Sequence, residues 1–144
     1  MAGRARLVNA AAVFVSPDLR RTSEYYRDIF GFEIVEHHGT EDAFAALYRD
    51  EVEIIVVQSQ RGEFESNTAR YGAGYDLYLD PEDLEGVDAL YSELKEKGAR
   101  IVREPAITPY GCYEFVVEDI DGRLIGIGRI RDRDVFFEGL PAAP

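Results

Sequence analysis

Apolar and polar residues alternate along much of this chain, and helical spacing interrupts the alternation twice. In the first half, the small apolar run from Asn9 to Val15 predicts a strand. Leu19 to Phe30 then places apolar residues three and four positions apart, as on one face of a helix. Three more strands are predicted after this helix, at Phe32 to His37, Ala43 to Tyr48 and Val52 to Val57.

The second half repeats this order at an offset of about 65 residues. Tyr75 to Leu79 predicts a strand and Pro81 to Lys97 a helix, and strands follow at Ala99 to Arg103, Tyr113 to Glu118 and Leu124 to Ile130. Units this short cannot bury their apolar faces alone, so we expect one domain with a groove where they meet. The expected domain covers residues 1–144, with module 1 at about 7–58, a connector at 59–74, module 2 at about 75–130 and a C-terminal tail at 131–144.

Residues that favour turns stand between the predicted elements. Asp18-Leu19 and Asp83-Leu84 each open a helix, and Ser16 or Asp18 can cap the first one. Gly31 follows that helix, where a glycine can end it. Asp121-Gly122 predicts a two-residue hairpin turn between the last two strands.

Composition and charge narrow the choice of partners. A net charge of −12 argues against nucleic acid, because phosphate contacts need a basic face. An acidic protein concentrates cations near its surface, which fits a cationic ligand, although acidity can also serve solubility alone. The single cysteine, Cys112, excludes an intramolecular disulfide and is expected to be a small core residue. No segment is long and apolar enough to span a bilayer, so we expect a cytoplasmic protein with no membrane partner.

Two local motifs connect this pattern to a known family. Asp18-Leu19 through Tyr25–Phe32 looks like the first helix and following strand of the vicinal oxygen chelate superfamily, and Glu118–Gly122 looks like its last hairpin, with Ile120 where proline is common. The chain resembles this superfamily, which includes glyoxalases, extradiol dioxygenases and bleomycin resistance proteins, over about residues 7–130. The resemblance implies an α+β fold of two βαβββ modules that form an incomplete barrel.

The resemblance also shows where a metal would bind. Enzymes of the superfamily hold a divalent metal on the first and last strands of each module. The corresponding positions here carry poor ligands, except for one glutamate: they are Ala10 or Ala11, Gly74 or Tyr75, Gly126, and Glu53. His37 and His38 are neighbours on a strand and point to opposite faces, so they cannot chelate one ion together. We therefore expect neither a metal nor another cofactor.

Small residues at the metal positions favour a binding protein over an enzyme. Gly126 and Gly128 share one face of the last strand and are expected to clear space for a ligand there, although a bulge or a barrel corner would also explain them. Aromatic residues would wall this space, Tyr113 among them, and Glu53 or Glu114 would supply a charge for an organic cation. The candidate ligand-binding residues are Phe44, Tyr48, Glu53, Tyr75, Tyr110, Glu114, Gly126 and Gly128. No catalytic residue is assigned.

The stretch Tyr110–Phe115 resembles the bleomycin-resistance branch, which sequesters a cationic antibiotic in a dimer groove without metal chemistry. This resemblance implies a metal-independent small-molecule binding protein that sequesters a cationic aromatic compound such as an antibiotic. It also implies a homodimer, with Asn9 to Val15 at the interface. A divergent glyoxalase-like lyase or isomerase, or a dioxygenase, that uses a divalent metal is the alternative, and a regulatory module that has lost its ligand is a third reading.

The purified protein is expected to contain no stoichiometric divalent metal, because only Glu53 keeps a ligand-forming side chain. Elemental analysis after growth in metal-replete medium checks this. One equivalent of zinc, iron, manganese or nickel per chain, lost on Glu53→Gln, would favour the enzyme instead.

Overall fold

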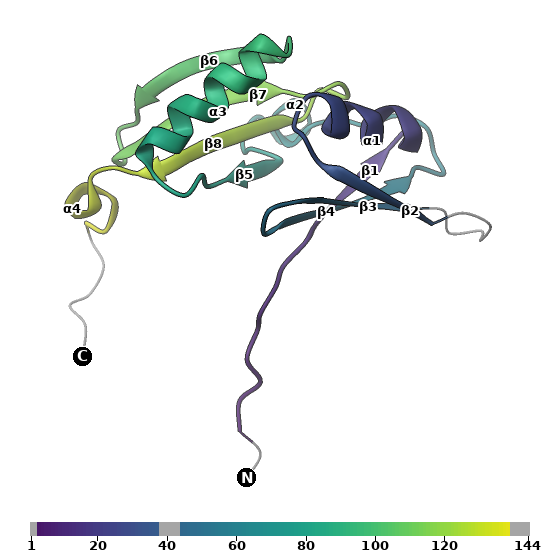
Figure 1. Ribbon diagram of the computed structural model, residues 1–144, viewed down its shortest axis with the longest axis horizontal. Coiled ribbons are helices and arrows are strands. Elements are labelled where there is room, and N and C mark those ends of the chain that lie inside the picture. Colours follow the sequence, from purple (N-terminus) through teal and green to yellow (C-terminus); the bar gives the residue numbers. More distant parts are fainter. Residues whose placement is uncertain (1–2, 38–43, 139–144) are drawn as a thin grey trace. The chain divides into compact units, whose positions relative to one another are not determined.

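The computed structural model describes residues 3–37 and 44–138 (Figure 1). The chain divides into two compact units, Met1–Glu63 and Phe64–Pro144, and each unit contains one four-stranded sheet. The boundary falls inside the predicted connector. No helix in the described ranges is long and apolar enough to cross a membrane.

The described residues of the first unit form one helix and four strands. In chain order they are β1 (Ala12–Ser16), α1 (Leu19–Asp28), β2 (Glu33–His37), β3 (Phe44–Arg49) and β4 (Val52–Gln58). The sheet order is β1-β4-β3-β2, in which β1 runs parallel to β4 and the other pairs are antiparallel. Asp18 caps α1 by accepting a hydrogen bond from the amide of Arg21 at 3.1 Å, as its position predicts. Gly31 follows the helix with a φ of +71°, a conformation that favours glycine.

Helix α1 covers one face of this sheet with aromatic residues. Tyr26 is fully buried, and its ring lies 5.1 Å from Phe30 and 5.7 Å from Phe14, measured between centroids. Leu47 and Ile54 are cross-strand partners and are also fully buried. Burying side chains of this size contributes about 1.5–3 kcal/mol each to folding.

The second unit repeats this topology and adds two short helices. Its elements are α2 (Asn67–Tyr71), β5 (Leu77–Leu79), α3 (Leu84–Glu96), β6 (Arg100–Ile107), β7 (Cys112–Glu118), β8 (Leu124–Ile130) and α4 (Arg133–Phe136). The sheet order is β5-β8-β7-β6, and α3 lies along one face of it (Figure 1). The predicted α+β class and the two βαβββ modules are therefore confirmed. Both α2 and α4 were missed, although Ser66 and Asp132 cap them.

Strand β1 begins later than the sequence predicts. Its pairing with β4 starts at Ala12, which lies opposite Ile54, and residues 3–11 form no ladder. The predicted start at Asn9 was therefore wrong, because small apolar residues form a strand only where a partner strand is present.

The turn between β7 and β8 is longer than the predicted two residues. It occupies residues 119–123, and the Asp119 carboxylate accepts hydrogen bonds from the amides of Asp121 and Arg123, both at 2.9 Å. The Arg123 side chain is buried and pairs with Asp119 at 3.1 Å and with Asp121 at 2.8 Å. Its guanidinium also lies 4.1 Å from the centroid of the Phe64 ring. These contacts hold the start of the second unit against its last hairpin.

Arg123→Ala should lower the free energy of unfolding by about 3–5 kcal/mol, because it leaves two buried carboxylates without their cation. Arg20→Ala is the control, because the Arg20–Glu24 pair is exposed and should change stability by less than about 1 kcal/mol. Urea unfolding monitored by circular dichroism measures both. Equal effects in the two variants would contradict the structural role of Arg123.

Candidate ligand-binding site

The second sheet buries a carboxylate on the face that α3 leaves uncovered. Phe115 is buried on the α3 side, where its ring meets that of Tyr91 on the helix. Its neighbour Glu114 must point to the opposite face, because successive residues of a strand alternate. Only 1% of Glu114 is exposed. A charge this deeply buried must be matched by hydrogen-bond donors or by an opposite charge.

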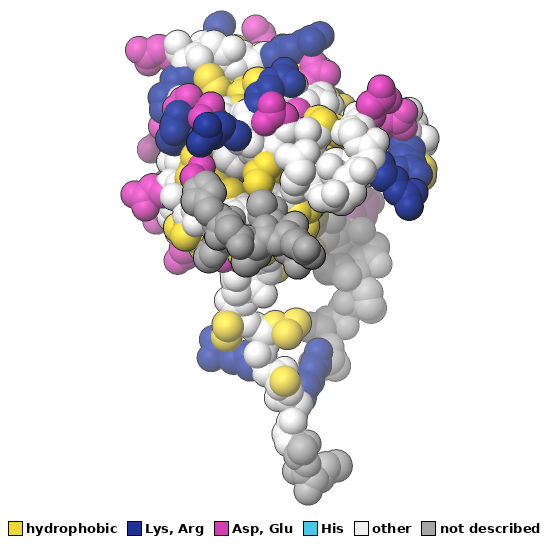
Figure 2. All heavy atoms as spheres, turned by 90° about the vertical axis from the view of Figure 1, so that its right-hand side faces the viewer, with side chains coloured by type: hydrophobic (Ala, Val, Ile, Leu, Met, Phe, Trp, Pro, Cys, Tyr) yellow, Lys and Arg dark blue, Asp and Glu magenta, His cyan; other side chains and the backbone are white. Residues whose placement is uncertain are grey.

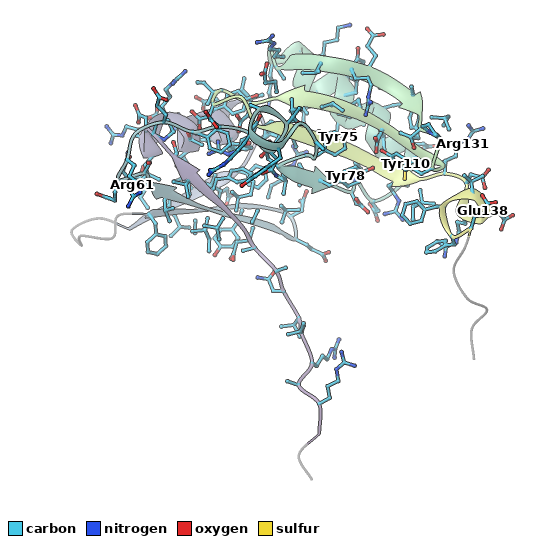
Figure 3. The ribbon with its side chains drawn as sticks, turned by 180° about the vertical axis from the view of Figure 1, so that it is seen from behind. Arg61, Tyr75, Tyr78, Tyr110, Arg131 and Glu138 are labelled. Atoms are coloured by element: carbon cyan, nitrogen blue, oxygen red, sulfur yellow. The ribbon has the colours of Figure 1, made fainter. Side chains whose placement is uncertain are left out.

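Three tyrosines and an arginine supply that match. The hydroxyl of Tyr78 donates to Oε2 of Glu114 at 2.7 Å, and that of Tyr75 donates to Oε1 at 3.0 Å. The hydroxyl of Tyr110 donates to the same Oε1. Arg103 forms an ion pair with Oε1 at 3.2 Å and also donates to the Tyr75 hydroxyl. Figure 3 shows Tyr75, Tyr78 and Tyr110 gathered over one part of this sheet, and we call the five residues the Glu114 cluster.

The phenols of the Glu114 cluster remain protonated at neutral pH. Burial is the largest cause that raises the pKa of Tyr75, Tyr78 and Tyr110, and the hydrogen bond to Glu114 raises each pKa further. Each hydroxyl proton is directed at the carboxylate, so each hydroxyl oxygen has only lone pairs left to offer a ligand. Tyr78 and Tyr110 are 39% and 45% exposed. Beside the guanidinium of Arg103, the cluster therefore presents ring surface and hydrogen-bond acceptors to its surroundings.

The two strand glycines make room for tyrosine rings. A Cβ on Gly126 would lie 2.6 Å from Cδ2 of Tyr75 and 2.8 Å from Cδ2 of Tyr78. A Cβ on Gly128 would lie 2.5 Å from the Tyr78 hydroxyl oxygen and would also meet Cβ of Glu114. Contrary to the sequence prediction, these glycines therefore do not clear an empty space for a ligand, because the protein's own side chains fill that space.

The other predicted ligand-binding residues lie in the first unit. Phe44, Tyr48 and Glu53 belong to β3 and β4, and Tyr48 is the cross-strand partner of Glu53. A hydrogen bond to Glu53 is the largest cause that raises the pKa of Tyr48. Within the second unit, the structure brings Tyr75, Tyr110, Glu114, Gly126 and Gly128 together.

One predicted wall residue points the wrong way, and two members of the cluster were missed. The Tyr113 hydroxyl donates to Asp88 on α3 at 2.5 Å, so this side chain lies on the α3 face. Tyr78 could have been found, because it pairs with Gly126 in the parallel β5–β8 ladder. Arg103 gives no comparable signal, because the register of β6 against β7 shifts on both sides of it.

The described residues contain no group of three or more His, Cys, Asp or Glu side chains that could hold a metal ion. His37 lies at the end of β2, and His38 lies outside the described residues. Cys112 is buried at the start of β7, and burial is the largest cause that raises the pKa of its thiol. Such a thiol is a poor nucleophile at neutral pH, since the thiolate is the reactive form.

Two surface hollows lie elsewhere in the second unit. One of about 600 Å³ lies between the β6–β7 turn and residues 131–135, and one of about 340 Å³ lies beside the start of α3. Arg131 and Ile107 line both hollows. Neither of these two hollows is lined by a member of the Glu114 cluster. Figure 2 shows acidic and basic side chains intermingled on the face that it draws.

Comparison with known proteins agrees with this architecture. The model of the Glyoxalase/Bleomycin resistance protein/Dioxygenase superfamily matches residues 8–127. The chain therefore belongs to this superfamily, and the resemblance seen in the sequence is confirmed. No curated protein matches the chain.

Several solved structures share the fold. A glyoxylase/bleomycin resistance protein/dioxygenase domain from Frankia sp. EAN1pec is 19% identical with a TM-score of 0.69, and the match covers 88% of this chain and 100% of that one. TnmS3, described as an antibiotic binding protein from Streptomyces sp. CB03234, is 22% identical with a TM-score of 0.60, covering 86% and 98%. TioX from Micromonospora sp. ML1 is 19% identical with a TM-score of 0.62, covering 85% and 98%.

Spectrophotometric titration should detect the Glu114 cluster as tyrosines that ionise above the ordinary tyrosine pKa of about 10. Gly126→Leu should move Tyr75 and Tyr78 off the sheet and return part of this late ionisation to the ordinary range. Gly3→Leu is the control, because a Cβ at Gly3 meets no atom within 4 Å. Identical titration curves for the wild type and Gly126→Leu would show that the glycine does not hold these rings in place.

Proposed function

We propose that this protein binds a small aromatic molecule without a metal, and that the ligand carries a positive charge, as some antibiotics do. The observation that carries the proposal is the Glu114 cluster, where partly exposed tyrosine rings surround a buried carboxylate. Aromatic side chains favour flat organic ligands, and their negative ring faces attract cations.

The arrangement of the rings suits stacking. Tyr75 and Tyr78 lie 6.1 Å apart between centroids with an angle of 24° between their planes. Tyr110 adds a third ring, held in place by its hydrogen bond to Glu114. Rings fixed in this way lose little conformational entropy when a ligand binds. The net charge of −12 also favours a cation over an anion.

The bonding of Glu114 supports a binding protein rather than an acid–base enzyme. Four donors already occupy its two oxygens: Tyr75, Tyr78, Tyr110 and Arg103. A general base needs an oxygen within reach of a substrate proton. The description of TnmS3 as an antibiotic binding protein agrees with the proposal, although at 22% identity the likeness concerns the fold alone.

We further propose that the chain forms one domain of two modules and acts as a homodimer in the cytoplasm. The α1-free face of the first sheet supports a dimer, because it leaves Val13, Val15 and Val35 60%, 49% and 47% exposed. Exposed apolar side chains gathered on one face favour an interface.

Phenyltrimethylammonium should bind more tightly than its neutral isostere tert-butylbenzene. Added salt should weaken the binding of phenyltrimethylammonium and leave the binding of tert-butylbenzene unchanged. Tyr110→Ala should reduce the affinity for the cation about fivefold, which corresponds to about 1 kcal/mol for one lost ring contact. Tyr71→Ala is the control, because Tyr71 is 72% exposed on α2 and outside the cluster. Isothermal titration calorimetry measures the affinity of the wild type for both probes and the affinity of each variant for the cation. The proposal fails if the two probes bind equally or if both substitutions have the same effect.

A further inference from the structure

The guanidinium of Arg103 occupies the open side of the Glu114 carboxylate. The side chain of Glu114 is fully buried, whereas that of Arg103 is 53% exposed. A single nitrogen, Nη2, makes both of its contacts, one with Oε1 of Glu114 and one with the Tyr75 hydroxyl. Arginine commonly holds a carboxylate with two parallel hydrogen bonds. The single hydrogen bond between Arg103 and Glu114 is therefore weaker than the two-bond contact that these side chains could form.

The backbone that carries Arg103 is irregular. The register of β6 against β7 shifts between Ile101 and Arg103 and again between Arg103 and Ala106. Glu114, by contrast, lies in an unbroken β7–β8 ladder opposite Gly128. The carboxylate is therefore fixed in the sheet, and the cation that faces it comes from a bulged strand.

Apart from the guanidinium of Arg103, which can only donate, the polar atoms that the cluster has left to offer are acceptors. The three phenol protons point to Glu114, so each phenol oxygen can only accept a further hydrogen bond. A group that replaced Arg103 would meet the negative carboxylate oxygen and the Tyr75 hydroxyl oxygen, and would need to donate to both. A planar cation with several N–H groups fulfils this requirement.

We propose that the Glu114 cluster is a cation subsite that Arg103 fills in the free protein and leaves when a ligand inserts an amidinium or guanidinium group. The choice of an amidinium or guanidinium ligand rests on the proposed function and makes it more specific. The subsite itself can be tested with a small cation alone. In the bound state, the ligand cation pairs with Glu114 and the half-exposed Arg103 turns into solvent.

Chemical rescue tests the subsite without an aromatic ligand. Arg103→Ala should lower the thermal midpoint, because Glu114 then lacks its cation, and methylguanidinium chloride should restore part of this loss in a saturable manner. Sodium chloride at equal ionic strength should not. Arg100→Ala is the matched control, because Arg100 lies on the same strand and pairs with Glu118 at 2.8 Å but is 78% exposed. Equal responses of the two variants to methylguanidinium, or no response of Arg103→Ala, would overturn the subsite. Arg103→Gln provides the same comparison if the alanine variant does not fold.

Benzamidine and its neutral isostere benzamide test the ligand class. Arg103→Ala should bind benzamidine about tenfold more tightly than the wild type does, because an internal competitor has been removed, and should bind benzamide unchanged. Weaker binding of benzamidine by Arg103→Ala than by the wild type would overturn the proposal. Tighter binding of benzoate than of benzamidine by the wild type would show that Arg103 receives an anion, and would also overturn it.

The two proposals can fail separately. Suppose that phenyltrimethylammonium binds to the wild type, but that methylguanidinium does not stabilise Arg103→Ala and that this variant binds benzamidine no more tightly than the wild type. The proposed function then stands and the subsite is wrong. If methylguanidinium rescues Arg103→Ala while no aromatic cation binds to the wild type, the subsite stands and the proposed function is wrong.

Discussion

The burial of one carboxylate determines the chemistry of the second unit. Glu114 lies in the middle of β7, on the face that α3 does not cover, and a buried charge requires compensation. Three phenols and one guanidinium provide it. Two of the phenol rings reach the carboxylate across β8, and they fit only because Gly126 and Gly128 have no side chains there. The requirement to compensate Glu114 therefore explains the tyrosines, the arginine and the glycines together.

The two units share a topology but differ on the face that their helix leaves uncovered. In the first unit this face carries exposed valines together with the Tyr48–Glu53 pair. In the second unit it carries the Glu114 cluster. A repeated βαβββ module thus supplies the same scaffold twice, while the residues on one face of each sheet differ. This agrees with the general finding that function depends on sites placed on a fold rather than on the fold itself.

A second group of buried charges lies in the last hairpin. Arg123 joins Asp119 and Asp121 within one hairpin, and its guanidinium lies over Phe64 at the start of the unit. Asp76 connects the same hairpin to α2, because its carboxylate accepts hydrogen bonds from the amides of Leu124 and Asn67. Arg123, Asp119 and Asp121 thus pair with one another inside the unit. The Glu114 cluster differs because its cation, Arg103, is half exposed.

The sequence by itself determined the order of the helix and strands in each βαβββ module, because a period of two or of 3.6 residues is a local property. It also assigned Glu114, Gly126 and Gly128 to one site, and the structure brings these residues together with Tyr75 and Tyr110. Only the tertiary structure decided what fills the space above the glycines, because the rings come from Tyr75 and from Tyr78 on another strand. Arg103 could not be predicted, since its approach depends on register shifts in β6 that have no local signal. Tyr113 was misplaced although strand alternation alone puts it on the face opposite its neighbour Glu114, and its hydrogen bond to Asp88 on α3 agrees with that. A local pattern determines which element forms, whereas the contacts of a side chain depend on residues distant in the chain.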